Sequence, residues 1–215
     1  MTVASAIIKG GSQDGQAIGE RATREYGLLV AQNMPPLVEL ARAGQIFTGS
    51  MTAAGAALPI YSNTAQVCGI WNPAGNSVDV VLLSLGITYV DTTGAAGGYC
   101  LGYLSNAPAQ LATGAAITAF TEAAAINAYL NGGAASKVKF TASAATVTAP
   151  AILRHLSLNQ NAFTTTGTGQ MPYASGIRFD GDVILTPGTA VFVAGNIATL
   201  AKLALSLTWA EIPRI

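Results

Sequence analysis

From Gln45 onward the sequence alternates between apolar and polar residues with a period of two, in short runs that end at turn-forming residues. The clearest run is Leu203-Ala-Leu-Ser-Leu-Thr-Trp209, in which every second residue is large and apolar. A period of two places alternate side chains on opposite faces of a β-strand, so each run predicts a strand with one buried face. This pattern constrains the fold most, because it favours sheets over helices along most of the chain.

The breaks between these runs carry turn chemistry, such as Asn72-Pro73-Ala-Gly75, Asp180-Gly181 and Pro187-Gly188. The expected strands are Gln45–Ala53, Thr64–Trp71, Val78–Val90, Gly98–Ser105, Lys137–Thr148, Ile152–Asn159, Gly176–Phe179, Asp182–Leu185, Thr189–Ala194 and Leu203–Ala210. Eight or more short strands at this spacing predict an all-β fold, a jelly-roll-like two-sheet sandwich.

One segment within the strand region has a different character. Residues Thr118–Leu130 are rich in alanine and end at Asn131-Gly132-Gly133. Thr121 followed by Glu122 can begin a helix, and Gly132 can end one. The segment therefore predicts a short helix inserted between strands.

The first 44 residues differ from the rest, because they hold eight of the twenty charged residues and several glycines. Within them, 13–24 is expected to be solvated and extended, and 26–31 to form a short apolar strand. A short helix is expected from Pro35 to Gly44, with proline in its first turn and glycine as its stop signal. The sequence thus predicts an N-terminal arm or attachment segment, residues 1–44, and a β-sandwich domain, residues 45–215.

The scarcity of charge is the strongest compositional signal. Only 9% of the residues are charged, against ~25% in typical soluble domains, while 51% are hydrophobic. A surface with so few charges is poorly protected against association. We therefore expect much of it to be covered by copies of the chain or by a partner.

The charge distribution also argues against nucleic acid and membrane as partners. Net charge is zero, and no Lys or Arg occurs between Arg42 and Lys137, so no basic patch for phosphates arises from the middle of the chain. No apolar run reaches the ~18–20 residues that a membrane helix needs. The N-terminus has no basic start followed by an apolar segment, so we expect synthesis in the cytoplasm without a signal peptide.

Residues suited to catalysis or metal binding are few. His155 is the only histidine, it has no acid in its own segment, and no Gly-x-Ser-x-Gly motif is present. Cys68 and Cys100 are expected to be buried free thiols, and Asp180 and Asp182 to be turn residues. The sequence predicts neither a catalytic site nor a cofactor or metal. The aromatic residues Trp71, Tyr99, Tyr103, Tyr129, Tyr173 and Trp209 are expected to pack in the core or in an interface.

Two parts of the chain resemble known proteins. The first consists of Arg24-Glu-Tyr-Gly-Leu-Leu-Val and Pro36-Leu-Val-Glu-Leu-Ala-Arg-Ala-Gly-Gln-Ile-Phe47. The second consists of Gly181-Asp-Val-Ile-Leu-Thr-Pro-Gly-Thr-Ala-Val-Phe-Val-Ala and Leu205-Ser-Leu-Thr-Trp-Ala-Glu-Ile-Pro213. Both are similar to tailed-bacteriophage jelly-roll virion proteins of the capsid decoration or cement type, which are often trimeric. The resemblance implies a structural role in the virion.

The expected function is therefore that of a non-enzymatic decoration protein, a homotrimer that binds the major capsid protein or other virion proteins. The residues expected at interfaces are Tyr26, Leu28, Pro36, Leu37, Leu40, Phe47 and Trp209. One alternative is a tail, baseplate or head-fibre component that binds host carbohydrate through exposed aromatic residues. Another is a small hydrolase on a β scaffold that depends on His155.

Overall fold

The structure is a computed structural model of the whole chain. It describes residues 21–22, 28–29, 37–60, 65–90, 99–105, 116–131, 133–143, 145–148, 151–156, 174–179, 181–195 and 202–214. Within these residues the chain is almost entirely β, and the single helix, α1 (Val38–Arg42), has five residues. No helix in this part of the chain is long and apolar enough to cross a membrane.

The chain divides into two units, Met1–Glu39 and Leu40–Ile215. The first unit contains β1 (Arg21–Ala22) and β2 (Leu28–Leu29), which pair antiparallel. The expected extended segment 13–24 and strand 26–31 are described only at these four residues. The expected helix 35–44 is described as α1, which lies across the boundary between the units and ends shortly before Gly44.

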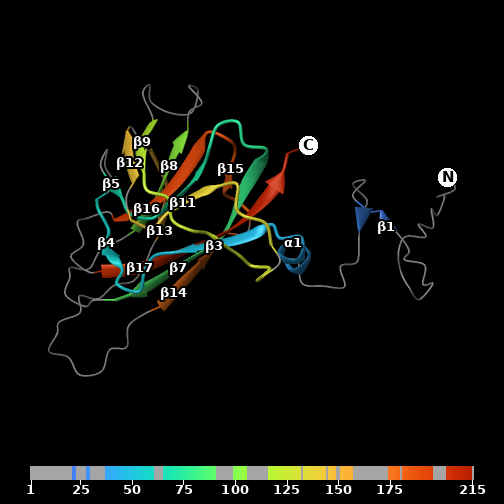
Figure 1. Ribbon diagram of the computed structural model, residues 1–215, viewed down its shortest axis with the longest axis horizontal. Coiled ribbons are helices and arrows are strands. Elements are labelled where there is room, and N and C mark those ends of the chain that lie inside the picture. The colour runs from blue at the N-terminus through green and yellow to red at the C-terminus, as the bar shows by residue number, and fades with distance from the viewer. Residues whose placement is uncertain are drawn as a thin grey trace. The chain divides into compact units, whose positions relative to one another are not determined.

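Two antiparallel sheets form the body of the second unit (Figure 1). The seven-stranded sheet has the order β10-β3-β17-β7-β14, with β4 paired to β17 and β15 paired to β7. Its strands are β10 (Ile126–Asn127), β3 (Ile46–Ser50), β17 (Lys202–Pro213), β7 (Val78–Tyr89), β14 (Ala174–Arg178), β4 (Ala56–Ala57) and β15 (Ile184–Leu185).

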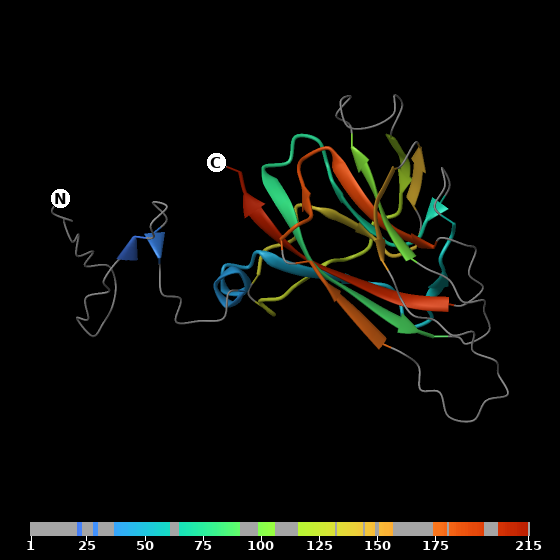
Figure 2. The same ribbon diagram turned by 180° about the vertical axis from the view of Figure 1, so that it is seen from behind.

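The five-stranded sheet has the order β11-β6-β16-β8-β13. Its strands are β11 (Lys139–Thr141), β6 (Gly69–Asn72), β16 (Thr189–Gly195), β8 (Tyr99–Ser105) and β13 (Ala151–Leu156). A smaller sheet of order β5-β12-β9 consists of β5 (Ala65–Gln66), β12 (Ala145–Thr148) and β9 (Ala116–Phe120). Seen from behind, β17 and β7 run side by side along the middle of the larger sheet (Figure 2).

Eight strands form a framework in which pairing is nested. In chain order they are β3, β6, β7, β8, β13, β14, β16 and β17. The first pairs with the eighth, the second with the seventh, the third with the sixth and the fourth with the fifth, always antiparallel. One sheet thus contains β3-β17-β7-β14 and the other β6-β16-β8-β13. The path is that of one long hairpin folded over on itself.

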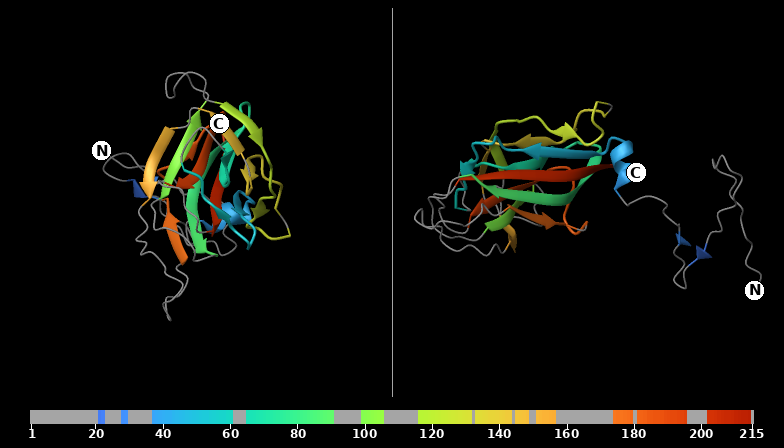
Figure 3. Two further views of the ribbon diagram at one scale, coloured as in Figure 1. Left: turned by 90° about the vertical axis from the view of Figure 1, so that its left-hand side faces the viewer. Right: turned by 90° about the horizontal axis from the view of Figure 1, so that it is seen from below.

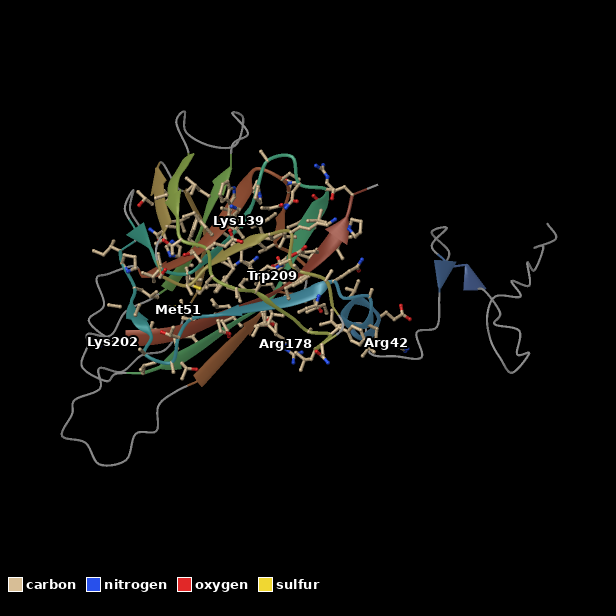
Figure 4. All side chains as sticks on the ribbon, viewed as in Figure 1. Arg42, Met51, Lys139, Arg178, Lys202 and Trp209 are labelled. Carbon is tan, nitrogen blue, oxygen red and sulfur yellow. The ribbon has the colours of Figure 1, made fainter. Side chains whose placement is uncertain are left out.

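The core lies between the two sheets, and it confirms the predicted all-β sandwich. Along β17 the side chains of Leu203, Leu205, Leu207 and Trp209 are buried, as the period-two pattern predicts. The Trp209 ring stacks on Phe47 from β3, with ring centroids 6.2 Å apart, and on Phe140 from β11, 6.1 Å away. Trp209 lies in the middle of the sandwich in Figure 4.

Glycine permits the close approach of the two sheets at this point. A Cβ added at Gly49 on β3 would lie 2.5 Å from Cγ of Phe140, which is closer than real Cβ contacts come. The absence of a side chain at Gly49 therefore makes room for the Phe140 ring between the sheets.

The expected strands are present in the structure, with two of them interrupted. Lys137–Thr148 is divided into β11 and β12, and Thr64–Trp71 into β5 and β6. The two breaks face each other, because β11 pairs with β6 and β12 pairs with β5. The expected turns at Gly75, Gly181 and Gly188 have positive φ angles of 87°, 86° and 90°, a conformation that glycine adopts without strain.

The predicted helix Thr118–Leu130 is wrong. This segment contains β9, then an isolated bridge from Ala123 to Phe140, and then β10, whose Ile126 lies opposite Thr48 on β3. The helix propensity of alanine is worth only a few tenths of a kcal/mol per residue, roughly, over most other residues. Pairing with two sheet edges outweighs that preference, because it satisfies the backbone and places the segment against the core.

Candidate interaction surfaces

The segment between β8 and β13 covers one lateral side of the sandwich. It adds β10 to the seven-stranded sheet beside β3, and it adds β11 to the five-stranded sheet beside β6. The bridge between Ala123 and Phe140 joins the two additions. We call this side, formed by β10 and β11, the first side.

An exposed apolar turn, described at residues 128–131 and 133–135, follows β10 on the first side. The Leu130 side chain is 74% exposed, that of Ile126 on β10 is 63% exposed, and Tyr129 is exposed as well. No charged residue occurs between Glu122 and Lys137. These three large side chains, Ile126, Tyr129 and Leu130, are called the first patch.

The Asn127 side chain holds this turn in place. Its Nδ2 donates to the carbonyl oxygens of Gly44, at 2.7 Å, and Ala134, at 3.1 Å. Its Oδ1 accepts from the Tyr129 backbone N–H at 2.8 Å. A Cβ added at Gly133 would overlap the Asn127 amide, so the turn passes close to this side chain only because residue 133 is glycine.

Glu211 on β17 fixes the other end of the turn to the core. Its carboxylate is almost completely buried and accepts hydrogen bonds from Ser136 Oγ, from the Lys137 backbone N–H at 3.0 Å and from Trp209 Nε1 at 3.2 Å. A buried carboxylate needs such donors to replace the water it has lost. The apolar turn is therefore held by polar groups beneath it while its large side chains stay exposed.

The opposite lateral side, which we call the second side, is formed by β13, β14 and β15. Here the side chains of Ile152 and Leu153 on β13, in the five-stranded sheet, and of Ile184 on β15, in the seven-stranded sheet, are exposed. These three residues are together called the second patch. Figure 3 (left) shows β13 and β14 on the opposite side of the sandwich from the yellow segment that follows β9.

An ion pair links the edges of the two sheets on the second side. Arg154 on β13 pairs with Asp182, which lies two residues before β15, and the Arg154 guanidinium lies 5.9 Å from the centre of the Phe179 ring. A comparable pair is found on the first side, where Lys139 Nζ lies 3.4 Å from a carboxylate oxygen of Glu122. Among the described residues, Arg178 on β14 is exposed and has no ion-pair partner, and Lys137 Nζ on the first side donates to the Ser77 hydroxyl.

The residues that the sequence predicted at interfaces are scattered in the structure. Tyr26 and Pro36 lie outside the described residues, Leu28 belongs to β2, Leu37 is exposed and Leu40 is half-buried. For Phe47 and Trp209 the prediction is wrong, because they are 2% and 0% exposed and pack in the core. The reason is the position of β17, which lies between β3 and β7 and not at a sheet edge.

Other residues considered from the sequence have ordinary surroundings. His155 is exposed on β13 and Asp182 is held by Arg154, while Asp180 lies outside the described residues. Trp71 packs against Phe120, with ring centroids 5.6 Å apart. Among the described residues, no three His, Cys, Asp or Glu side chains are grouped so that they could hold a metal ion.

Apart from Tyr129, which was expected in the core or in an interface, the residues of both patches were missed in the sequence because they were assigned to other roles. Ile126, Tyr129 and Leu130 fell in the segment predicted to be a helix, and Ile152 and Leu153 in a strand expected to be half-buried. The uncharged run between Glu122 and Lys137 does not single out the first patch, because the longer runs 43–78 and 92–121 are uncharged as well.

The architecture defines an all-β sandwich protein with two exposed apolar patches on its lateral sides. Comparison with protein-family models, with curated proteins and with solved structures found no match to this chain.

Proposed function

We propose that the chain is a structural subunit of a tailed-bacteriophage virion, a capsid decoration or cement protein that self-associates as a homotrimer and binds the capsid surface. The observation that carries this proposal is the pair of exposed apolar patches on a chain with only 9% charged residues. Exposed large apolar side chains on a surface with few charges favour association over a solitary existence in water.

The strand order supports the proposal at the level of the fold. Nested pairing of eight antiparallel strands, first with eighth through fourth with fifth, is the arrangement expected of a jelly roll. Jelly rolls serve as building blocks of viral capsids, so this classification agrees with a virion role. The resemblance of the segments around Phe47 and Trp209 to phage decoration proteins points in the same direction.

The division of the chain supports a separate attachment segment. The first unit ends at Glu39, and the sandwich has its own core without it. We propose that residues 1–44 bind the major capsid protein or another virion protein, while the sandwich domain makes the contacts between copies. The role is non-enzymatic in this proposal, and it requires no cofactor.

The test is binding to virus particles that lack the chain, prepared from the phage that encodes it. We expect the full chain to sediment with these particles. A variant without residues 1–30 keeps its far-ultraviolet circular dichroism spectrum and its native mass, but no longer sediments with them. Unchanged binding by the shortened variant would reject the role of the arm, and absence of binding by the full chain would reject the decoration function.

A further inference from the structure

The turn that follows β10 contains an asparagine followed by a glycine, Asn131 and Gly132. Every other asparagine of the chain precedes a residue that carries a side chain. We infer that Asn131 is a site of spontaneous deamidation, where the side-chain carboxamide is converted to a carboxylate without an enzyme. This inference goes beyond the proposed function and does not depend on it.

The reaction needs only the chain, hydroxide and water. Hydroxide takes the proton of the Gly132 backbone nitrogen, which then attacks Cγ of Asn131. The new N–Cγ bond forms, the Cγ–Nδ2 bond breaks, and the leaving nitrogen takes a proton from water and departs as ammonia. Water then opens the resulting succinimide ring. Cutting the new bond gives aspartate, and cutting the original peptide bond gives isoaspartate.

Glycine at the next position is what makes ring closure fast. The attacking nitrogen of Gly132 has no Cβ beside it, so the Asn131 side chain can approach it without a steric clash. Asn72 is followed by Pro73, whose nitrogen has no proton to lose. Asn76 and Asn127 precede serine and alanine, whose Cβ atoms crowd the same approach.

The structure leaves the Asn131 carboxamide accessible. Asn131 is exposed and has a positive φ of 65°, and within the described residues its side chain has no hydrogen-bond partner. The carboxamide can therefore rotate toward the next nitrogen while water and hydroxide reach it from outside. The anchors of the turn lie on either side of Asn131, since the Gly133 backbone N–H donates to the Tyr129 carbonyl oxygen at 3.0 Å.

Two other asparagines in the described residues have side chains that are held. Asn127 Nδ2 donates to the carbonyl oxygens of Gly44 and Ala134, and its Oδ1 accepts from a backbone N–H. Asn76 Nδ2 donates to Asn72 Oδ1 and to the Lys137 carbonyl oxygen, both at 2.8 Å. These carboxamides must break their hydrogen bonds before a ring can form, and that requirement slows the reaction.

Deamidation changes the chemistry of the first patch. Aspartate and isoaspartate each add one negative charge to a chain whose net charge is zero. The new carboxylate is next to Leu130 in the sequence, within a stretch that has no charged residue between Glu122 and Lys137. Isoaspartate also inserts a methylene group into the backbone of the turn. The first patch therefore gains an acidic group as the protein ages.

The experiment is a time course on the full folded chain in mildly alkaline buffer at physiological temperature. Peptide mapping by mass spectrometry should show that the peptide containing Asn131 gains about 1 Da and separates into aspartate and isoaspartate forms. We expect Asn131 to convert at least roughly tenfold faster than Asn127, because one net hydrogen bond is worth about that factor. Isoelectric focusing should show a new, more acidic band, which forms more slowly in mildly acidic buffer.

The matched control is Asn131→Gly. Glycine adopts a φ of 65° without strain, so the turn is kept while the carboxamide is removed. We expect this variant to keep its circular dichroism spectrum and to lose both the mass gain in this peptide and the acidic band. The wild-type chain unfolded in guanidinium chloride serves as the reference for the rate that the sequence alone gives.

Three results would overturn the inference. If the Asn131 peptide of the folded chain gains no mass, whether or not the unfolded chain does, the folded turn is not a deamidation site. A mass gain that persists in Asn131→Gly would assign the change to another residue of the peptide. Conversion of Asn127 as fast as Asn131 would show that exposure and the following glycine do not select the site. None of these results affects the binding of the chain to virus particles.

Discussion

Cys68 shows how completely the sandwich excludes water. Its side chain is fully buried between β5 and β6, and its thiol is free. Burial raises the pKa of the Cys68 thiol from 9.0 to about 12, because the thiolate would lie in an apolar core without solvation. Above pH 9 the unfolded chain releases this proton while the folded chain retains it. The contribution of Cys68 to stability is therefore fully present below pH 9 and is lost as the pH rises toward 12.

We predict a steeper loss of stability at alkaline pH for the wild-type chain than for Cys68→Ala. Between pH 9 and 12 the free energy of unfolding should fall by an extra ~1.4 kcal/mol per pH unit in the wild type, the value for one proton. Urea unfolding of both proteins at several pH values measures this slope. Cys68→Ala also leaves a small cavity, which lowers the free energy of unfolding at every pH. The two proteins are therefore compared by how steeply this free energy falls with pH and not by its absolute value. If the free energy of unfolding falls equally steeply with pH in both proteins, the pKa of the Cys68 thiol is not raised in the folded chain.

At the scale of single elements, the turn after β10 depends on one glycine. In Gly133→Ala the new Cβ would displace the Asn127 amide, which then loses its bonds to Gly44 and Ala134. We predict that the Tyr129 amide proton, which Asn127 protects, exchanges with solvent roughly tenfold faster, equivalent to losing about 1.4 kcal/mol of local protection. Self-association should weaken as well, because the first patch is no longer held rigidly.

Hydrogen exchange followed by NMR, together with native mass spectrometry, measures both effects of Gly133→Ala. The matched control is Gly176→Ala on β14, where a Cβ meets no atom within 4 Å. We expect the control to leave the exchange of the Tyr129 amide at the wild-type rate. An unchanged rate in Gly133→Ala would mean that Asn127 does not hold the turn.

The strands were predictable from the sequence, but their order was not. Alternation along β17 is a local signal, and it locates the strand and its buried face correctly. The partners of the segment 123–127 are Phe140 and Thr48, which are distant in sequence, so its local alanine content suggested a helix instead. The same limit explains Trp209, whose size and apolar character suit an interface as well as a core. Only the central position of β17 decides between them.

At the scale of the whole molecule, the small number of charges should make the proposed self-association insensitive to salt. The described residues contain three surface ion pairs, and those beside the patches are formed within the chain. We predict that the native mass stays constant from about 0.1 M to about 1 M NaCl, while the Debye length falls from ~10 Å to ~3 Å. Sedimentation velocity across this range is the measurement. Dissociation at high salt would indicate a contact made by opposite charges.

The nested pairing of the framework has a consequence for the order in which the chain can fold. β3, near the start of the sandwich, has β17 as its framework partner, and β17 also pairs along nearly the whole of β7. During synthesis the larger sheet therefore lacks its middle strand until residues 202–213 leave the ribosome. Contacts between residues so distant in sequence form slowly. Until they form, β3 and β7 expose the unpaired edges that later bind β17. A chain cut short before β17 would lose the strand that joins β3 to β7, and the larger sheet would remain in two separate parts.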